Sequence, residues 1–218
     1  MSDFAAEWER PEFDSVPSLA ENAVWRLREC DGTVLRKTLQ EVYRDFCKRS
    51  AALRTWRKIN LEPHTAHYLV APILSGEIDC VTRVLRDGLY PLRQRCEWSV
   101  SGDPPFIDLP FAKRIVASDT AVEDVPPEFV LVEAVEIPHI SEERAPKAFL
   151  RRYGDAIVDG ALFRLMSMTN RPWSDPEQAR QHGIAYSNAL SEARLRSANG
   201  GPAANAGQSF ALDMSGMV

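Results

Sequence analysis

The sequence lacks long hydrophobic runs and has no large excess of charge of either sign. Its longest notable apolar run, residues 68–74, contains a proline and is far shorter than the roughly 20 residues that a transmembrane helix needs. The acidic first residues are unlike the basic start of a signal peptide. Apolar residues make up 44% of the 218 residues and charged residues 26%, which are ordinary globular values. We therefore expect a soluble protein made in the cytoplasm, with one full domain and small additions.

Closely spaced cysteines are also missing. The four cysteines, at positions 30, 47, 80 and 96, are too far apart along the chain to form a zinc ribbon. A chain of this size hardly needs a disulfide framework, so we expect reduced thiols. Cys47 falls on the apolar stripe of a predicted helix, which favours a buried structural thiol over a nucleophile.

Catalytic motifs are largely absent. The chain has no glycine-rich phosphate loop, no His-Glu-x-x-His motif and no Gly-x-Ser-x-Gly motif. His64 and His67 form a His-x-x-His pair, but Pro63 argues against the helix that would aim both rings at one metal ion. Asp155 and Asp159 share a helix face, where a solvated or interfacial role is favoured over acid–base chemistry. His139 and His182 are single residues without a visible partner, and we expect neither a metal nor a cofactor.

Helical periodicity is strong in three segments. Apolar residues at steps of three and four predict a helix over 34–54, with Thr33 as its N-cap. The same pattern predicts helices over 147–168 and 176–198. Between these two helices Asn170 fits a left-handed helix end, Pro172 prevents continuation, and Asp175 and Pro176 provide an N-cap and a first-turn proline. Together they predict an antiparallel hairpin over 147–198.

The region between the first helix and the hairpin, residues 56–140, holds nine of the fifteen prolines. Short β-prone runs at 67–70, 78–84 and 129–137 predict a small antiparallel sheet with long loops. We expect Glu133 and Glu136 to face outward in part. The predicted fold class is α+β, an antiparallel bundle of three main helices with a small antiparallel β-sheet subdomain and extended N- and C-terminal arms.

Both ends of the chain differ in composition from the predicted central domain over 33–198. Residues 1–32 have helix-breaking residues and scattered aromatics, which indicate an N-terminal arm. Residues 199–218 are rich in Gly, Ala, Asn and Ser, and only Phe210, Leu212 and Met214 alternate to form an apolar edge. This flexible tail is either a disordered end or a strand that docks on a partner.

The hairpin sequence contains a helix reading Tyr-x-x-Ala-Ile-x-x-Gly-Ala-Leu-x-x-Leu, a Pro-Trp-x-Asp-Pro turn and a second helix with an early Ala. The residues at these positions are Tyr153, Ala156, Ile157, Gly160, Ala161, Leu162, Leu165, Pro172, Trp173, Asp175, Pro176 and Ala179. This pattern resembles the C-terminal helical hairpin of head-to-tail adaptor (connector) proteins of short-tailed bacteriophages, in which Asp or Asn occurs at the position of Asp175. The likeness is good over 130–198, weaker over 33–60, and absent over 60–128 and in the tail.

The resemblance implies a structural virion protein at the head–tail junction, synthesised in the host cytoplasm. It implies a homo-oligomeric, twelve-fold ring beneath the portal protein that extends the DNA channel and receives the tail nozzle or tube. Double-stranded DNA would pass through the ring without sequence-specific binding. The small residues Gly154, Ala156 and Gly160 are suited to close helix packing in such a protein, and Ala156 and Gly160 are expected to face another helix. Trp173 is expected to be mostly buried, pinning the turn.

Charge is sorted into blocks along the chain. Residues 1–31 carry eight acidic and three basic side chains, residues 36–58 two acidic and eight basic, and residues 119–143 eight acidic and none basic. Blocks of opposite sign can meet inside the fold or across copies, or form separate solvated faces. For an adaptor we expect the last two blocks to be separated, with Glu123 and Asp124 at the DNA channel or a subunit interface. The tail residues Phe210, Leu212 and Met214 are expected to bind the portal.

Two other functions remain open. The first is a small cytoplasmic enzyme whose site is built from the 60–128 loops and residues such as His64, His67 and Asp108. The second is a cytoplasmic interaction module that uses its C-terminal tail as a peptide ligand. Large assemblies would favour the adaptor, whereas an enzyme of this size is more often a monomer or dimer.

Overall fold

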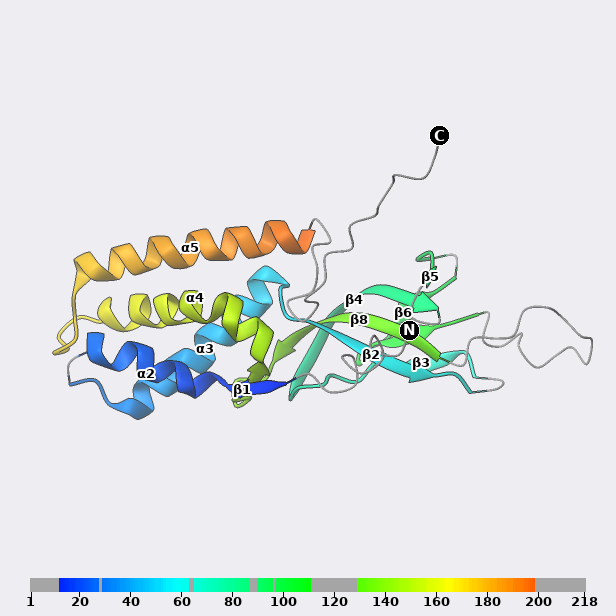
Figure 1. Cartoon of the computed structure of the whole chain (residues 1–218), viewed down its shortest axis with the longest axis horizontal. Coiled ribbons are helices and arrows are strands. Elements are labelled where there is room, and N and C mark those ends of the chain that lie inside the picture. Colours follow the sequence, from blue (N-terminus) through cyan, green and yellow to red (C-terminus); the bar gives the residue numbers. More distant parts are fainter. Residues whose placement is uncertain are drawn as a thin grey trace, which may run out of the picture.

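The fold is mixed α+β, as the sequence predicts, with helices gathered at one end of the molecule and sheets at the other (Figure 1). The computed structural model of the chain describes residues 12–27, 29–62, 65–86, 90–95, 97–110 and 129–198. Across these ranges, no helix combines the length and apolar character that spanning a membrane requires.

The first long helix, α3, spans Gly32–Ser50 and is shorter than the predicted 34–54 helix. Its N-cap is Asp31 rather than Thr33, because the Asp31 carboxylate accepts a hydrogen bond from the Thr33 N–H at 2.6 Å. The helix ends where Ala51 adopts a left-handed conformation with a φ of 52°. The chain then enters a strand at Arg54, so the last predicted turn of helix is instead a helix cap and a strand start.

Helices α4 (Lys147–Met166) and α5 (Pro176–Ala198) lie side by side and are joined by a turn at the far end of the helical region (Figure 1). Gly160 marks a close approach of three helices. A Cβ at this position would lie 2.6 Å from Val42 Cγ1 of α3 and 2.8 Å from Tyr186 Cδ2 of α5. The expectation that Gly160 faces another helix is therefore confirmed, and it faces two. Ala156, one turn earlier, is buried in the same core.

Aromatic rings fill the middle of this helical core. Phe46 of α3 has its ring centroid 5.2 Å from that of Tyr153, 6.2 Å from that of Phe149 and 6.1 Å from that of Tyr186. The tilted and edge-on arrangements are those that aromatic pairs prefer, and each pair contributes roughly 0.5–1.5 kcal/mol beyond its area burial. Side chains from all three long helices thus share one apolar core.

The N-terminal segment is packed on the helices, which corrects the expectation of an arm for the described part of residues 1–32. Val16, Ala23 and Leu27 are fully or almost fully buried in the helical core, and this burial holds the segment in place. Strand β1 (Phe13–Ser15) pairs antiparallel with β9 (Arg144–Pro146). Three short helical pieces follow: η1 (Val16–Leu19), α2 (Ala20–Ala23) and η2 (Val24–Arg26).

Two antiparallel sheets form the other end of the molecule. The larger has the order β2 (Arg54–Asn60), β8 (Phe129–Pro138), β4 (Gly76–Arg86) and β5 (Tyr90–Pro91). The smaller has the order β3 (His67–Leu69), β7 (Phe106–Asp108) and β6 (Ser99–Ser101). A second apolar core, separate from that of the helices, includes residues from both sheets. The β-rich character predicted for 56–140 is confirmed for its described residues, with the first strand starting slightly earlier.

Candidate functional site

Strand β8 carries two buried glutamates at the junction of the helical and sheet regions. Glu133 is 2% exposed and Glu136 is 1% exposed, so the expectation that both face outward in part is wrong. The physical reason is the position of β8, which is paired on both edges and covered on both faces, with nine of its ten residues buried. A carboxylate in such a place must be hydrogen-bonded or paired.

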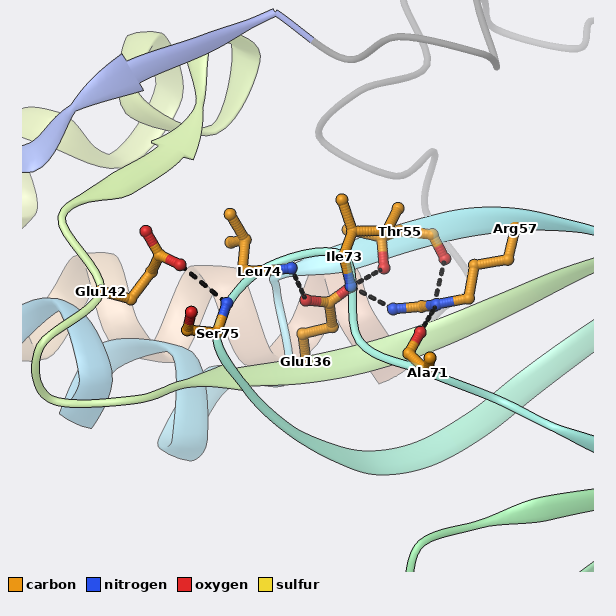
Figure 2. A network of polar contacts seen from close by, with 8 residues as sticks. All are labelled: Thr55, Arg57, Ala71, Ile73, Leu74, Ser75, Glu136 and Glu142. Atoms are coloured by element: carbon orange, nitrogen blue, oxygen red, sulfur yellow. Dashed lines mark hydrogen bonds and ion pairs between the residues drawn. The ribbon is translucent and has the colours of Figure 1, made fainter.

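Glu136 is the most connected of these carboxylates (Figure 2). It accepts hydrogen bonds from the Thr55 hydroxyl and the Arg57 guanidinium of the neighbouring strand β2. On its other side it accepts the backbone N–H groups of Ile73 and Leu74, each at 3.1 Å. Arg57 also donates to the Ala71 carbonyl, so the guanidinium joins β2 to the same loop.

Glu142 holds the next residue of that loop. The Ser75 N–H donates to a Glu142 oxygen at 2.7 Å, and the Arg144 side chain donates to both Glu142 oxygens at 3.0 and 3.2 Å. Three successive N–H groups, from Ile73 to Ser75, therefore bind two carboxylates. We call this set the carboxylate joint: Glu136, Glu142, Thr55, Arg57, Arg144 and the backbone of residues 71–75.

The surroundings of Glu142 favour its ionised form. Burial by itself raises the pKa of Glu142, but the hydrogen bonds from the side chain and N–H of Arg144 and from the N–H of Ser75 lower that pKa to about 2. Burial lowers the pKa of Arg57 from its ordinary value, while the adjacent Glu136 carboxylate opposes this shift. Each carboxylate of the joint thus accepts hydrogen bonds from several donors of the protein.

The joint reaches the helical core through its loop. Leu74 donates its N–H to Glu136 while its side chain is buried in the same core as α3 and α4. A second link comes from α3, where Arg44 donates to the Pro138 carbonyl at 2.5 Å and lies 3.2 Å from a Glu77 oxygen. The sheets and helices are therefore connected both by backbone hydrogen bonds and by side-chain contacts near the joint.

Glu133 brings the two large charge blocks together. Its carboxylate lies 3.5 Å from Arg54 Nη1 and 3.6 Å from Arg83 Nε, and it accepts the Thr82 hydroxyl. Arg54 and Arg57 belong to the basic block 36–58, whereas Glu133 and Glu136 belong to the acidic block 119–143. The expectation that these blocks are separated on one subunit is wrong for their described parts. The pairing of β2 with β8 forces opposite charges from the two blocks side by side.

The predicted hairpin residues fall in α4 and in the turn that leads into α5. Tyr153 is buried, and Asp175 caps α5 by accepting the Gln178 N–H at 3.0 Å, with Pro176 as the first helical residue. Asn170 has the left-handed φ of 60° expected for it. Trp173 is mostly buried against the helical core, as expected. Its ring packs on the core from the bundle's end, while Arg171 lies over the ring at 5.7 Å.

The histidine and aspartate candidates form two separate pairs. His67 contacts Asp108 across the smaller sheet, and Ser99 donates to the other Asp108 oxygen at 3.3 Å. The serine hydroxyl bonds the carboxylate rather than the imidazole, so these three residues lack the nucleophile–base contact of a hydrolytic triad. His64 lies outside the described residues.

His182 has a partner that sequence reasoning missed. Its Nδ1 lies 2.8 Å from an Asp159 oxygen of α4, so this contact links the two hairpin helices. Asp155, one turn earlier on α4, is exposed. Of the two aspartates predicted to form a solvated or interfacial face, Asp159 therefore contacts the neighbouring helix and Asp155 faces solvent. Cys47 is fully buried, as expected, and burial raises the pKa of its thiol well above its ordinary value.

Metal chemistry gains no support from the described part of the chain, where no three His, Cys, Asp or Glu side chains are placed to hold an ion. The carboxylates of the joint already bind protein donors on several sides. The hydrogen bonds of the joint position the sheets relative to the helices. The predicted portal-binding residues Phe210, Leu212 and Met214 and the predicted interface residues Glu123 and Asp124 lie outside the described residues.

Glu142, Thr55 and the 71–75 loop were missed by sequence reasoning. The available signal was the spacing of glutamates in and after a predicted strand that is otherwise apolar, at positions 133, 136 and 142. Comparison with known proteins adds no assignment. No protein-family model matches the chain, and no curated protein matches it significantly.

Proposed function

We propose that this chain is a structural head-to-tail adaptor of a short-tailed bacteriophage virion. It would form a ring beneath the portal protein, join the DNA-filled head to the tail nozzle or tube, and extend the DNA channel. In this role the protein is not an enzyme and needs no cofactor. Twelve copies would match the symmetry that the sequence resemblance implies.

The observation that carries the proposal is the α4–α5 hairpin. Residues of the resembling motif occupy the positions that a rigid hairpin needs: Gly160 at the helix contact, Trp173 on the turn, and Asp175 with Pro176 at the start of α5. Each of these residues determines part of the local structure of the hairpin. Their agreement with the motif therefore supports a hairpin like the one in adaptor proteins.

The finer architecture of the proposal is an antiparallel bundle of three main helices, α3, α4 and α5, as the rigid body of each subunit. The shared aromatic core around Phe46 supports this inference. A ring subunit that transmits load between a head and a tail benefits from such a body, because packed interiors have low compressibility.

The carboxylate joint supports an adaptor for a different reason. A connector must keep two binding ends in a fixed relation, and the joint fixes the sheets relative to the helices through Glu136 and the 71–75 loop. Buried charges need their partners in place, so they favour a single arrangement of the two ends over sliding or rotated alternatives.

Two further parts of the proposal concern residues outside the described ranges. We propose that Phe210, Leu212 and Met214 bind the portal as an extended segment, with residues 200–202 as the hinge. Glu123 and Asp124 would lie at the channel or at a subunit contact. A negative channel wall repels DNA phosphates and keeps the genome from adhering in transit.

The experiment is electron microscopy and co-sedimentation of the full chain with its cognate portal. The proposal expects a ring on one face of the portal, and loss of that ring when residues 199–218 are deleted. The truncated chain should still unfold at the same denaturant concentration, since the described core ends at Ala198. Full-length protein that neither binds portals nor forms rings on them refutes the adaptor function.

A further inference from the structure

The C-terminal end of α5 is fastened to the junction between the helices and the sheets. Figure 1 shows this end of α5 at the sheet-facing end of the helical region. Arg54, the first residue of β2, donates from Nη2 to the Ser197 carbonyl at 2.5 Å. The Ser197 hydroxyl in turn donates to the Ala51 carbonyl at 3.1 Å. One turn earlier on α5, Arg194 donates from Nε to the Arg49 carbonyl at 2.7 Å. We call Arg54, Arg194 and Ser197 the α5 clamp.

The α5 clamp satisfies backbone carbonyls at the ends of two helices. The last four carbonyls of an α-helix have no N–H donor within the helix, and that end carries a partial negative charge. The contacts of the clamp bring the C-terminal ends of α3 and α5 together, so their like partial charges oppose the meeting. Arg54 and Arg194 each place a positive charge beside one of these carbonyls, which offsets that repulsion.

Arg54 also connects the end of α5 to the central strand of the larger sheet. Its Nη1 lies 3.5 Å from a Glu133 oxygen of β8, while its Nη2 holds the Ser197 carbonyl. The side chains of Arg54 and Glu133 are 9% and 2% exposed, so this contact is shielded from water. A guanidinium presents its donors in a rigid fork, which allows one arginine to bind both acceptors. The end of α5 therefore has a fixed position relative to the sheet as well as to α3.

The α5 clamp lies directly before the tail. Ser197 is two residues from the start of the 199–218 segment, and the proposed hinge at 200–202 follows at once. The end of a helix frays unless other contacts hold it. A tether that leaves a body at a fixed point has a higher effective concentration at a matched site than one that leaves from a frayed end. A fixed exit also lowers the ordering entropy that binding must overcome.

We propose that the α5 clamp positions the tail for portal binding by fixing the point at which residues 199–218 leave the protein. Arg54, Arg194 and Ser197 are positioning residues, because they act on the portal through the tail and do not touch it. This inference rests on the proposed function, which assigns portal binding to the tail. In a closed ring, the same fixed exit in every copy presents the tails at equal spacing.

Arg54→Lys tests the clamp in the full chain. Lysine keeps a positive charge beside Glu133, but its single nitrogen cannot hold both Glu133 and the Ser197 carbonyl. Hydrogen exchange of the amides of residues 195–198 should become about tenfold faster, the effect of losing one hydrogen bond to a charged group. Unchanged exchange at these amides overturns the proposal.

Two arginines in the last turns of α5 provide a matched comparison. Arg194 reaches across to the Arg49 carbonyl, whereas Arg196 contacts Glu192 of its own helix. Arg194→Met should therefore accelerate exchange at residues 195–198, and Arg196→Met should leave it unchanged. Equal acceleration in the two variants would mean that any arginine of this helix end has the same effect, and would overturn the proposal.

Portal binding separates positioning from a merely structural role. Arg54→Lys should weaken binding of the full chain to portals by about three- to tenfold, because the tail loses its fixed exit. Insertion of ten Gly and Ser residues after Ala198 frees the exit in any case, so in that chain Arg54→Lys should cause no further loss. An equal loss in the inserted chain would mean that Arg54 acts through the stability of the fold, and would overturn the proposal.

Failure of this inference and failure of the adaptor function give different results. If the wild type binds portals and Arg54→Lys binds them equally well, the positioning role is refuted and the adaptor function stands. If the wild type does not bind portals, the adaptor function is refuted and the positioning role with it.

Discussion

The helical end and the sheet end of this molecule are held together by different means. At the helical end, apolar stripes of α3, α4 and α5 meet around Phe46 and Gly160 in a core with few charges. At the sheet end, the central strand β8 places Glu133 and Glu136 among arginines of its neighbours. Apolar packing thus shapes each end, and buried polar groups join apolar residues such as Leu53 and Leu74 in the contacts between the ends.

This difference matters for an adaptor. Apolar cores tolerate exchange of one hydrophobic side chain for another, but a buried carboxylate needs its donors in specific places. A molecule that must present one end to a portal and the other to a tail gains orientation from such groups. The predictions below separate the two kinds of stabilisation.

The largest effect is expected at the carboxylate joint. Glu136→Leu would leave Arg57 and the N–H groups of Ile73 and Leu74 buried without their acceptor, and should lower the free energy of unfolding by about 3–5 kcal/mol. Urea unfolding followed by circular dichroism measures this change. Glu143→Gln, seven residues later on the exposed surface, is the matched control and should change the free energy by less than about 0.5 kcal/mol.

The double variant Glu136→Leu with Arg57→Met sharpens the same prediction. Removing both charges should recover part of the loss, because the uncompensated guanidinium is gone. If Glu136→Leu alone is as stable as the wild type, the buried carboxylate does not hold the two ends.

The next effect is expected at the helical end. Gly160→Ala places a methyl group 2.6 Å from Val42 Cγ1, so the helices must move apart and the free energy of unfolding should fall by about 1–3 kcal/mol. Gly160→Leu should abolish folding or assembly. Gly32→Ala in α3 is the matched control, since nothing lies within 4 Å of its Cβ position. Equal stability of the two alanine variants would show that the three helices do not meet at Gly160.

A smaller effect is expected at the hairpin turn. Trp173 is mostly but not fully buried, so Trp173→Ala should cost about 2 kcal/mol, less than the 3–5 kcal/mol typical of a fully buried aromatic. Thermal unfolding of the variant measures the loss. Unchanged thermal stability would contradict a role for the indole ring in pinning the turn.

The smallest effect is a dependence on pH at the edge of the joint. The pKa of Glu142 is about 2 in the folded chain against an ordinary value of 4.5, so its contribution is fully present above pH 4.5 and is lost as the pH falls through 2. Because Arg144 is partly solvated, we expect this contribution to be about 1 kcal/mol. Urea titrations at pH 7, 4.5 and 2 should show Glu142→Gln destabilised at pH 7 and most of that difference from the wild type lost at pH 2. A constant difference across this range would contradict the assignment.

Much of the helical end could be predicted from the sequence because helix stripes and caps are local signals. The Asn170, Asp175 and Pro176 expectations depended on conformations that those residues set by themselves, and each is confirmed. The end of α3 was missed because Ala51 takes a left-handed conformation that its sequence does not demand. The sequence predicts an arm at the N-terminus because the buried residues of this segment, Val16, Ala23 and Leu27, are too sparse to form a stripe.

The carboxylate joint could not be predicted, because it depends on pairings across long sequence separations. Glu136 meets Thr55 only after β2 pairs with β8, and it meets Ile73 only after the loop folds over both strands. The sequence predicts that Glu133 and Glu136 face outward in part, but nine of the ten residues of β8 are buried. The charge blocks gave a correct hint that opposite signs could meet inside the fold, although they could not say which residues would pair.

Hydrogen exchange measured residue by residue, in the wild type and in Glu136→Leu, tests the central claim most directly. If the buried carboxylate holds the sheets to the helices, the variant should show greatly accelerated exchange in β2, β8 and the 71–75 loop while the amides of α4 and α5 remain protected. Exchange that is unchanged in β2 and β8, or accelerated equally in all helices and strands, would contradict the account.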